Sequence, residues 1–291
     1  MSSLGRFGQF LESVTDARPL AVARLIIGGA AFLRGLVSYH LFDLVLTPGV
    51  IPARALEWIP EMTRGAMPWY TGVWLFVSAA FALGYRTRLN GSILVALIAY
   101  HLAADLNFFW SHVYFLGCLI LLLTAANAGT DWSFDWSASG GGRKTVPRWG
   151  VVLLKLHVSI VYFVAALAKL NPEFLSGAVV GRGILHPEFL KTPEALVAMA
   201  WGTIFFEAVM AFAFWLKPLR LWAIGAGIFF HALIPGTLGF YGGLVVFSAS
   251  VIGTYVVFLD ADEFAAAERF VLGTLKRIGF PSGLQRRPAA Q

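Results

Sequence analysis

Residues 149–170, with the sequence WGVVLLKLHVSIVYFVAALAKL, form an apolar run that few ionisable side chains interrupt. A helix that crosses the hydrocarbon core of a bilayer needs about 20 predominantly apolar residues. The run has this length and composition, so it is predicted to be a transmembrane helix. Its last turn holds Lys169, a cation that lipid surroundings disfavour. The segment therefore predicts a membrane-spanning fold. It also identifies Lys169 as a residue whose position in the membrane needs an explanation.

The remaining chain has the same apolar character. Of its 291 residues, 58% are hydrophobic and 13% are charged, against about 45–50% and 25% in soluble domains. This composition excludes a water-soluble domain, and the single cysteine, Cys118, excludes a disulfide scaffold. Seven further apolar segments lie at about 20–46, 68–84, 89–108, 112–128, 196–216, 219–236 and 242–259. We predict an all-α integral membrane protein, a polytopic bundle of about eight transmembrane helices.

The loop cations give the predicted orientation. Cytoplasmic loops of membrane proteins are enriched in lysine and arginine. With the N-terminus inside and eight crossings, most of the loop cations fall on the inner side. We expect an N-in/C-in transmembrane domain at 1–260, in a bacterial inner (cytoplasmic) membrane, followed by an amphipathic helix and tail at 261–291 on the cytoplasmic surface. The formal net charge of +6 is attributed to these inner loops, and no nucleic-acid partner is expected.

In this orientation, most ionisable side chains of the spans gather in the outer half of the bundle. Such residues are costly in lipid, and each is a candidate for function or for a buried pairing. The candidates are His101, Asp105, His112, Lys169, Glu207 and His231. Glu207 is the hardest to dismiss, because a carboxylate near the midplane must be protonated or paired.

Simpler structural roles are also open for these residues. His101 and Asp105 are four residues apart, which would place them on one face of a helix as a satisfied buried pair. Two ligands do not make a metal site, and no metal is predicted. Arg24, near the inner end of the first span, is expected to extend its side chain to the headgroups. Lys169 could do the same at the outer end.

Several short motifs occur in an order that resembles a known family. They are YFVAALAKLN at 162–171, SHVYFLG at 111–117, WSFD at 132–135, FFE at 205–207, FFH at 229–231 and GYRTRL at 84–89. Together they resemble the vitamin K-dependent gamma-glutamyl carboxylases and their bacterial-type homologues. The wider grouping is the HTTM (horizontally transferred transmembrane) domain family. The resemblance covers about residues 20–260.

The resemblance implies a defined chemistry. In the carboxylases a lysine, matched here by Lys169, deprotonates vitamin K hydroquinone, which then reacts with O2. The strong base so formed removes a proton from a glutamate, and the carbanion captures CO2. A histidine that assists the carboxylation is matched by His112. The cofactors implied are a reduced quinone (vitamin K hydroquinone or menaquinol), O2 and CO2, in a pocket lined by His101, Asp105, Tyr162, Glu207 and His231.

Two alternatives to this enzyme remain open. The chain has no counterpart of the large luminal domain of the animal enzymes, so the acceptor could differ from a glutamate peptide. The protein could instead be a non-redox membrane factor that binds, matures or exports a secreted peptide or protein. A transporter with a proton relay is disfavoured, because the sequence shows no internal repeat.

The enzyme hypothesis depends on one physical condition. Burial in apolar surroundings disfavours the charged form of a lysine side chain and leaves a free amine that can act as a base. A dry site would also protect a reactive base from water. The hypothesis expects the Lys169 amine to be shielded from solvent and near the ring of His112. A nitrogen bathed in solvent, or held by a carboxylate and far from that ring, would remove this chemistry.

Overall fold

The computed structural model describes residues 3–278, except 48, 52, 55, 143, 185, 186 and 239–241. Within this part, eight helices form the main bundle. They are α2 (Arg18–Val45), α3 (Met67–Leu83), α4 (Thr87–Ala104), α5 (Ser111–Ala125), α7 (Arg148–Ala168), α10 (Pro193–Ala213), α11 (Lys217–Leu238) and α12 (Gly242–Tyr255). Each of the eight predicted segments overlaps one of these helices. Four of them, α2, α7, α10 and α11, are long and apolar enough to cross a membrane. The predicted helical architecture is therefore confirmed, whereas the eight crossings remain a prediction.

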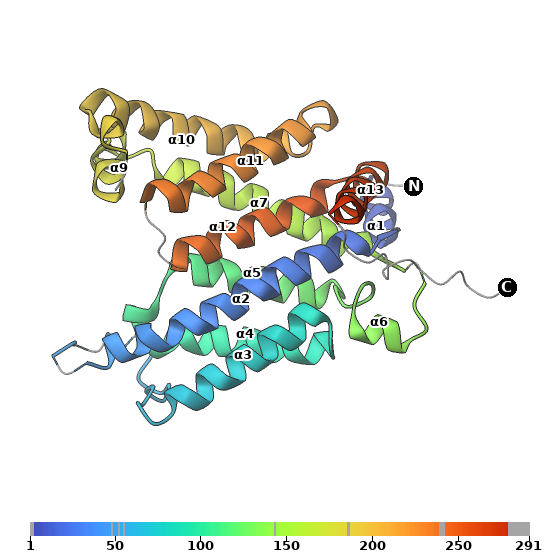
Figure 1. Cartoon of the computed structure of the whole chain (residues 1–291), viewed down its shortest axis with the longest axis horizontal. Helices are drawn as coiled ribbons and strands as arrows, with labels where there is room; N and C mark the ends of the chain where they lie inside the picture. Colours follow the sequence, from blue (N-terminus) through green and yellow to red (C-terminus); the bar gives the residue numbers. More distant parts are fainter. Residues whose placement is uncertain are drawn as a thin grey trace.

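The bundle has two groups of helices that meet at α12 (Figure 1). In one group, α2 packs against α3 and α5, and α4 packs against both α3 and α5. In the other, α10 packs along α7 and contacts α11. Helix α12 contacts α2 on one side and α11 on the other, and the main hydrophobic core runs through both groups.

The short elements gather at the two ends of the bundle. Helix α1 (Ser3–Glu12), helix α6 (Phe134–Ala138) and helix α13 (Ala261–Arg277) lie at the same end (Figure 1). Strand β1 (Val14–Asp16) pairs antiparallel with β2 (Thr145–Pro147). Helices α8 (Pro172–Leu175) and α9 (Ala178–Gly183) follow α7, and α9 lies at the opposite end (Figure 1). The 3₁₀ helices are η1 (Leu106–Phe108), η2 (Glu188–Lys191) and η3 (Val256–Phe258).

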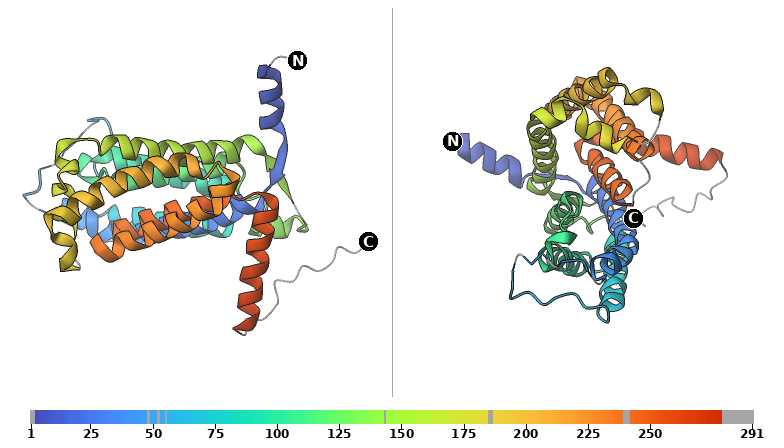
Figure 2. Two further views of the ribbon diagram at one scale, coloured as in Figure 1. Left: turned by 90° about the horizontal axis from the view of Figure 1, so that it is seen from above. Right: turned by 90° about the vertical axis from the view of Figure 1, so that its left-hand side faces the viewer.

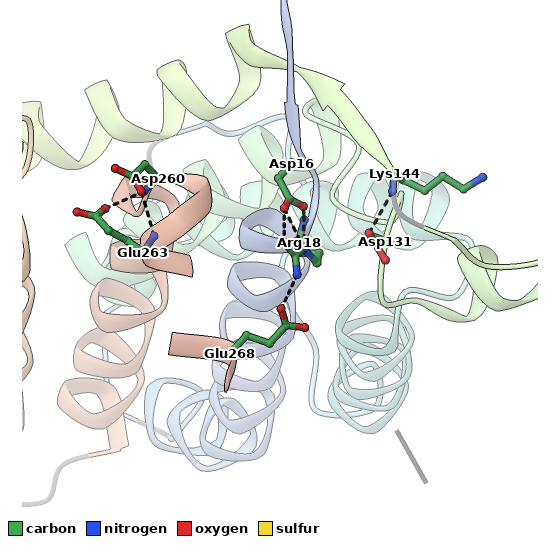
Figure 3. Close-up of polar contacts among 7 residues, drawn as sticks. All are labelled: Asp16, Arg18, Asp131, Lys144, Asp260, Glu263 and Glu268. Atoms are coloured by element: carbon green, nitrogen blue, oxygen red, sulfur yellow. Dashed lines mark hydrogen bonds and ion pairs between the residues drawn. The ribbon is translucent and has the colours of Figure 1, made fainter. Parts of the chain in front are cut away.

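Helices α1 and α13 lie across the bundle axis (Figure 2). Helix α13 starts with a capping box, in which the Asp260 carboxylate accepts from the N–H of Glu263 and the Glu263 side chain accepts from the N–H of Asp260. Arg18, at the start of α2, forms ion pairs of 2.5 Å with both Asp16 and Glu268 (Figure 3). The pair with Glu268 fastens α13 to the start of α2, and the pair with Asp16 joins β1 to it.

Arg24 is a structural connector. Its side chain is buried, and its guanidinium donates to the carbonyl oxygens of Ala82, Ala128, Asp131 and Trp132. The expectation that it extends to the headgroups is wrong, because the turn after α3 and the loop after α5 fold over it and supply acceptors.

The WSFD motif at 132–135 also takes part in the contacts between α2, α3 and α4. The Asp135 carboxylate accepts from the backbone N–H groups of Arg86 and Thr87 and so caps the start of α4. Gly84 ends α3 with a φ of 74°, and a Cβ there would lie 2.3 Å from Cβ of Ser133. Only glycine fits this close approach. The motif therefore ties α2, α3 and α4 together at the end that also holds α1 and α13.

Candidate functional site

Lys169 and Glu207 form an ion pair between two helices. Lys169 is the C-cap residue of α7, and Glu207 lies within α10. The Lys169 amine donates to both carboxylate oxygens, at 2.9 Å to Oε1 and 2.7 Å to Oε2. The same nitrogen lies 3.3 Å from the carbonyl oxygen of Ala165 and 5.8 Å from the centre of the Phe174 ring. The lysine side chain is 25% exposed and the glutamate side chain 11%, so the pair is partly shielded and still reachable.

This geometry corrects one expectation. The Lys169 amine is held by a carboxylate, whereas the hypothesis expected it near the ring of His112. Among the described residues, no hydrogen bond, ion pair or ring contact joins Lys169 to His112. The physical reason is that Glu207 faces α7 and needs a partner of its own, as a carboxylate inside an apolar helix must. The chemical unit at this position is therefore a lysine–glutamate pair.

A second polar group lies between α7, α11 and α12. The Tyr162 hydroxyl is 2.9 Å from Nε2 of His231 and 2.5 Å from the hydroxyl of Tyr255. All three side chains are buried. Tyr162 lies two helical turns before Lys169 on α7, so this group continues along the face of α7 that carries the ion pair. Sequence reasoning missed Tyr255, although a tyrosine hydroxyl within an apolar span requires a hydrogen-bonding partner.

His101 and Asp105 do not pair with each other. Helix α4 ends at Ala104, and Asp105 has extended backbone dihedrals with φ of −155° and ψ of 134°. Its carboxylate accepts from the backbone N–H groups of Asn107 and Ala53. The expectation of a shared helical face is wrong, because Asp105 caps η1 instead of continuing the helix.

His101 contacts an arginine instead. Nε2 of His101 lies 3.3 Å from Nη2 of Arg34 on α2. Both side chains are only 1% exposed. The His101 ring also packs against the rings of Phe42, Trp74 and Phe108. Sequence reasoning did not single out Arg34, although an arginine within an apolar span is itself a signal.

His112 lies in the first turn of α5, beside α12. Its ring centre is 5.6 Å from that of Trp110. Gly243 on α12 packs so closely that an added Cβ would lie 2.9 Å from Nε2 of His112. The predicted site residues therefore fall into separate groups: Lys169 with Glu207, Tyr162 with His231, His101 with Arg34, His112 beside α12, and Asp105 at η1.

The comparison with protein families agrees with the resemblance seen in the sequence. Residues 13–262 match the family model of the HTTM domain. The matched part includes every helix of the bundle and all of the candidate residues. No solved structure matches the chain.

Proposed function

The chain belongs to the HTTM domain family, and from this premise we propose that it is a membrane enzyme with carboxylase-like chemistry. It would use a reduced quinone and O2, with Lys169 and Glu207 as its acid–base unit, and would carboxylate a glutamate with CO2 or act on another acceptor. The observation that carries the proposal is the family match over residues 13–262, and the contact between the Lys169 amine and the Glu207 carboxylate identifies the two groups that would exchange the proton.

The pair can change its charge state without losing its contact. One proton moving from Nζ to a carboxylate oxygen converts ammonium and carboxylate into amine and carboxylic acid. The proposal requires this neutral form, because only an uncharged Nζ can accept a proton. The Lys169 amine would then take up a proton at Nζ and become the ammonium. Glu207 would keep its own proton as the carboxylic acid during this step. The Lys169–Glu207 pair thereby takes the role of the isolated lysine amine that the sequence alone led us to expect.

The surroundings of the pair fit a planar apolar cofactor. The Phe174 ring lies beside the amine. Leu170, which follows Lys169, and Phe205, on α10 two residues before Glu207, are exposed. A bound reduced quinone would supply the reducing equivalents and, with O2, a strong base. The residues of this chain would bind and orient it, exclude water and exchange a proton at Nζ. His112 is assigned to the carboxylation half by the family resemblance alone.

The proposal also includes the position of the protein in the membrane. We assign all eight bundle helices as membrane spans in a bacterial inner membrane, with both termini inside. Lys169 then lies toward the periplasmic face, because α7 would run outward and end there.

The test is formation of quinone epoxide by the purified protein. Wild type in lipid nanodiscs receives reduced vitamin K or menaquinol, O2, CO2 and a glutamate-containing peptide. Lys169→Ala and Glu207→Gln should each abolish the epoxide, since either change breaks the acid–base pair. The matched control is Lys155→Ala, on the same helix but over the ring of Phe258, and it should retain activity.

Two results would contradict this proposal. One is the absence of epoxide from folded wild type with both quinols. The other is normal epoxide formation by a folded Lys169→Ala variant. If a secreted peptide copurifies with the protein and is still processed after Lys169→Ala, the non-redox alternative is the better account.

A further inference from the structure

Arg34 has an unusual combination of burial and missing partners. Its side chain is 1% exposed, yet among the described residues no carboxylate forms an ion pair with it. Nη2 faces His101, whereas Nε and Nη1 have no hydrogen-bonding partner. A guanidinium carries five N–H donors and remains charged in proteins. A buried, unpaired charge is strongly unfavourable, so this arrangement indicates that an acceptor is missing.

The neighbouring histidine cannot be that counter-ion. Because an arginine only donates, Nε2 of His101 must be the acceptor in the 3.3 Å contact. His101 is then neutral and carries its proton on Nδ1, a second buried atom without a partner. Tyr70, also close to Arg34, donates its hydroxyl to the carbonyl of Leu97 and is therefore neutral as well. The net charge of this cluster is that of the guanidinium.

Arg34 is one of the residues that line a cavity of about 290 Å³. The cavity is lined by Arg34, Leu41, Leu44, Val45, Val50, Asn107, Phe108 and Trp110. Six of these eight side chains are apolar, and Arg34 is the only charged one. The lining does not include Lys169, Tyr162 or Glu207, so this cavity is separate from the ion pair described above.

We propose that Arg34 and this cavity form a binding site for a carboxylate carried on an apolar chain. The planar guanidinium matches a carboxylate, which can accept from two of its N–H groups at once. A single negative charge neutralises the cluster, whereas a dianion would leave an excess charge in apolar surroundings. The Leu, Val and aromatic walls complement a hydrocarbon chain. This site goes beyond the proposed quinone chemistry and does not depend on it.

The probe for this site is dodecanoate, with dodecanol and acetate as comparisons. Dodecanol has the chain without the charge, and acetate has the carboxylate without the chain. Binding to the whole protein in phosphatidylcholine nanodiscs is followed by quenching of tryptophan fluorescence with 12-bromododecanoate, because Trp110 lines the cavity. Trp110→Phe should remove the saturable part of the quenching. We expect dodecanoate to bind at least about ten-fold more tightly than either comparison compound.

Variants of Arg34 decide the proposal. Arg34→Met removes the charge and keeps the bulk, and it should weaken dodecanoate binding by at least about ten-fold. Arg34→Lys keeps the charge but loses the planar fork, and serves as the second variant if Arg34→Met does not fold. Arg64→Gln, an exposed cation paired with Asp43, should bind like wild type. Equal binding of dodecanoate to wild type and a folded Arg34 variant, or equal binding of dodecanol and dodecanoate, would overturn the proposal.

Discussion

Arg24 and Arg34 lie on the same helix, and each is 1% exposed, yet they are stabilised differently. The Arg24 guanidinium donates to four carbonyl oxygens, while most donors of Arg34 have no acceptor. Leaving a buried polar group unsatisfied costs about 1–3 kcal/mol. Arg24→Met should therefore lower the free energy of unfolding by about 3 kcal/mol or more, because several carbonyls lose their donor.

Arg34→Met should have the opposite effect in the absence of a ligand. Removing an unpaired buried charge eliminates its desolvation penalty, so the melting temperature should rise or stay unchanged. Thermal unfolding of the two variants in one detergent measures both effects. A loss of stability in Arg34→Met equal to that in Arg24→Met would contradict the difference that we infer between their environments.

The ion pair between Lys169 and Glu207 predicts a specific pattern in a double-mutant cycle. Breaking a fully buried pair costs about 3–5 kcal/mol, and the partial exposure of the Lys169 side chain reduces the expected cost to about 2 kcal/mol. Lys169→Met and Glu207→Leu should each destabilise the protein by this amount. The double variant should recover most of the loss, because no unpaired charge remains. Additive losses in denaturant unfolding would show that the two side chains are not coupled.

The sequence identified single polar residues better than their partners. Lys169, Glu207 and His231 were found because each interrupts an apolar run. The pairing of Lys169 with Glu207 was not predicted, because it depends on how α10 packs along α7. The pairing of His101 with Asp105 was predicted wrongly, because helical spacing was extended past Ala104, where the chain leaves the helix. Partners that lie on different helices cannot be derived from the spacing within one segment.

At the scale of elements, the apolar runs predicted the bundle helices well, whereas helix ends were harder to predict. The ends depend on individual contacts, such as the Asp135 carboxylate on α6, which caps α4 from 48 residues further along the chain. The capping box of α13 is the exception that sequence could reveal, because an aspartate followed three residues later by a glutamate is a local signal.

The cap of α13 predicts a dependence on pH. The N–H of Glu263, which donates to the carboxylate, lowers the pKa of Asp260 below its ordinary value of 3.8, and Lys217 and Arg220 act in the same direction. A lowered pKa means that the folded state favours the ionised carboxylate. Its contribution is therefore fully present above the ordinary value and is lost as the pH falls through the lowered one.

Substitutions at Asp260 distinguish the effect of its capping hydrogen bond from the effect of its negative charge. Asp260→Ala should destabilise the first turn of α13 by about 1 kcal/mol, whereas Asp260→Asn keeps a capping oxygen and should retain most of the stability. Amide hydrogen exchange at residues 261–264 measures both at neutral pH. Equally fast exchange in the two variants would mean that the charge, with its ion pairs, matters more than the cap.

At the scale of the whole molecule, one end of the bundle has the features of a membrane interface. The end with α1, α6 and α13 is held by charged contacts, including the ion pairs of Arg18 and the bonds of the Asp131 and Asp260 carboxylates (Figure 3). Helices α1 and α13 lie across the bundle axis there (Figure 2), and Phe7, Phe10 and Phe270 are exposed on them. Such helices suit the plane of a membrane interface. This end is therefore expected to lie at a membrane surface, which is the cytoplasmic one in the topology that we propose.

The number of crossings can be tested with single cysteines in a Cys118→Ser background. If all eight bundle helices cross, Ser139 and Asp262 lie inside and Thr63 and Ser176 lie outside. If only α2, α7, α10 and α11 cross, Ser139 moves outside and Ser176 inside, while Thr63 and Asp262 keep their sides. We expect an impermeant maleimide to label the Thr63→Cys and Ser176→Cys variants in intact cells, and the other two only after permeabilisation. Labelling of the Ser139→Cys variant in intact cells, together with protection of Ser176→Cys, would contradict the eight crossings. It would also contradict the fold, because the pairing of β1 with β2 places the starts of α2 and α7 at the same end of the bundle.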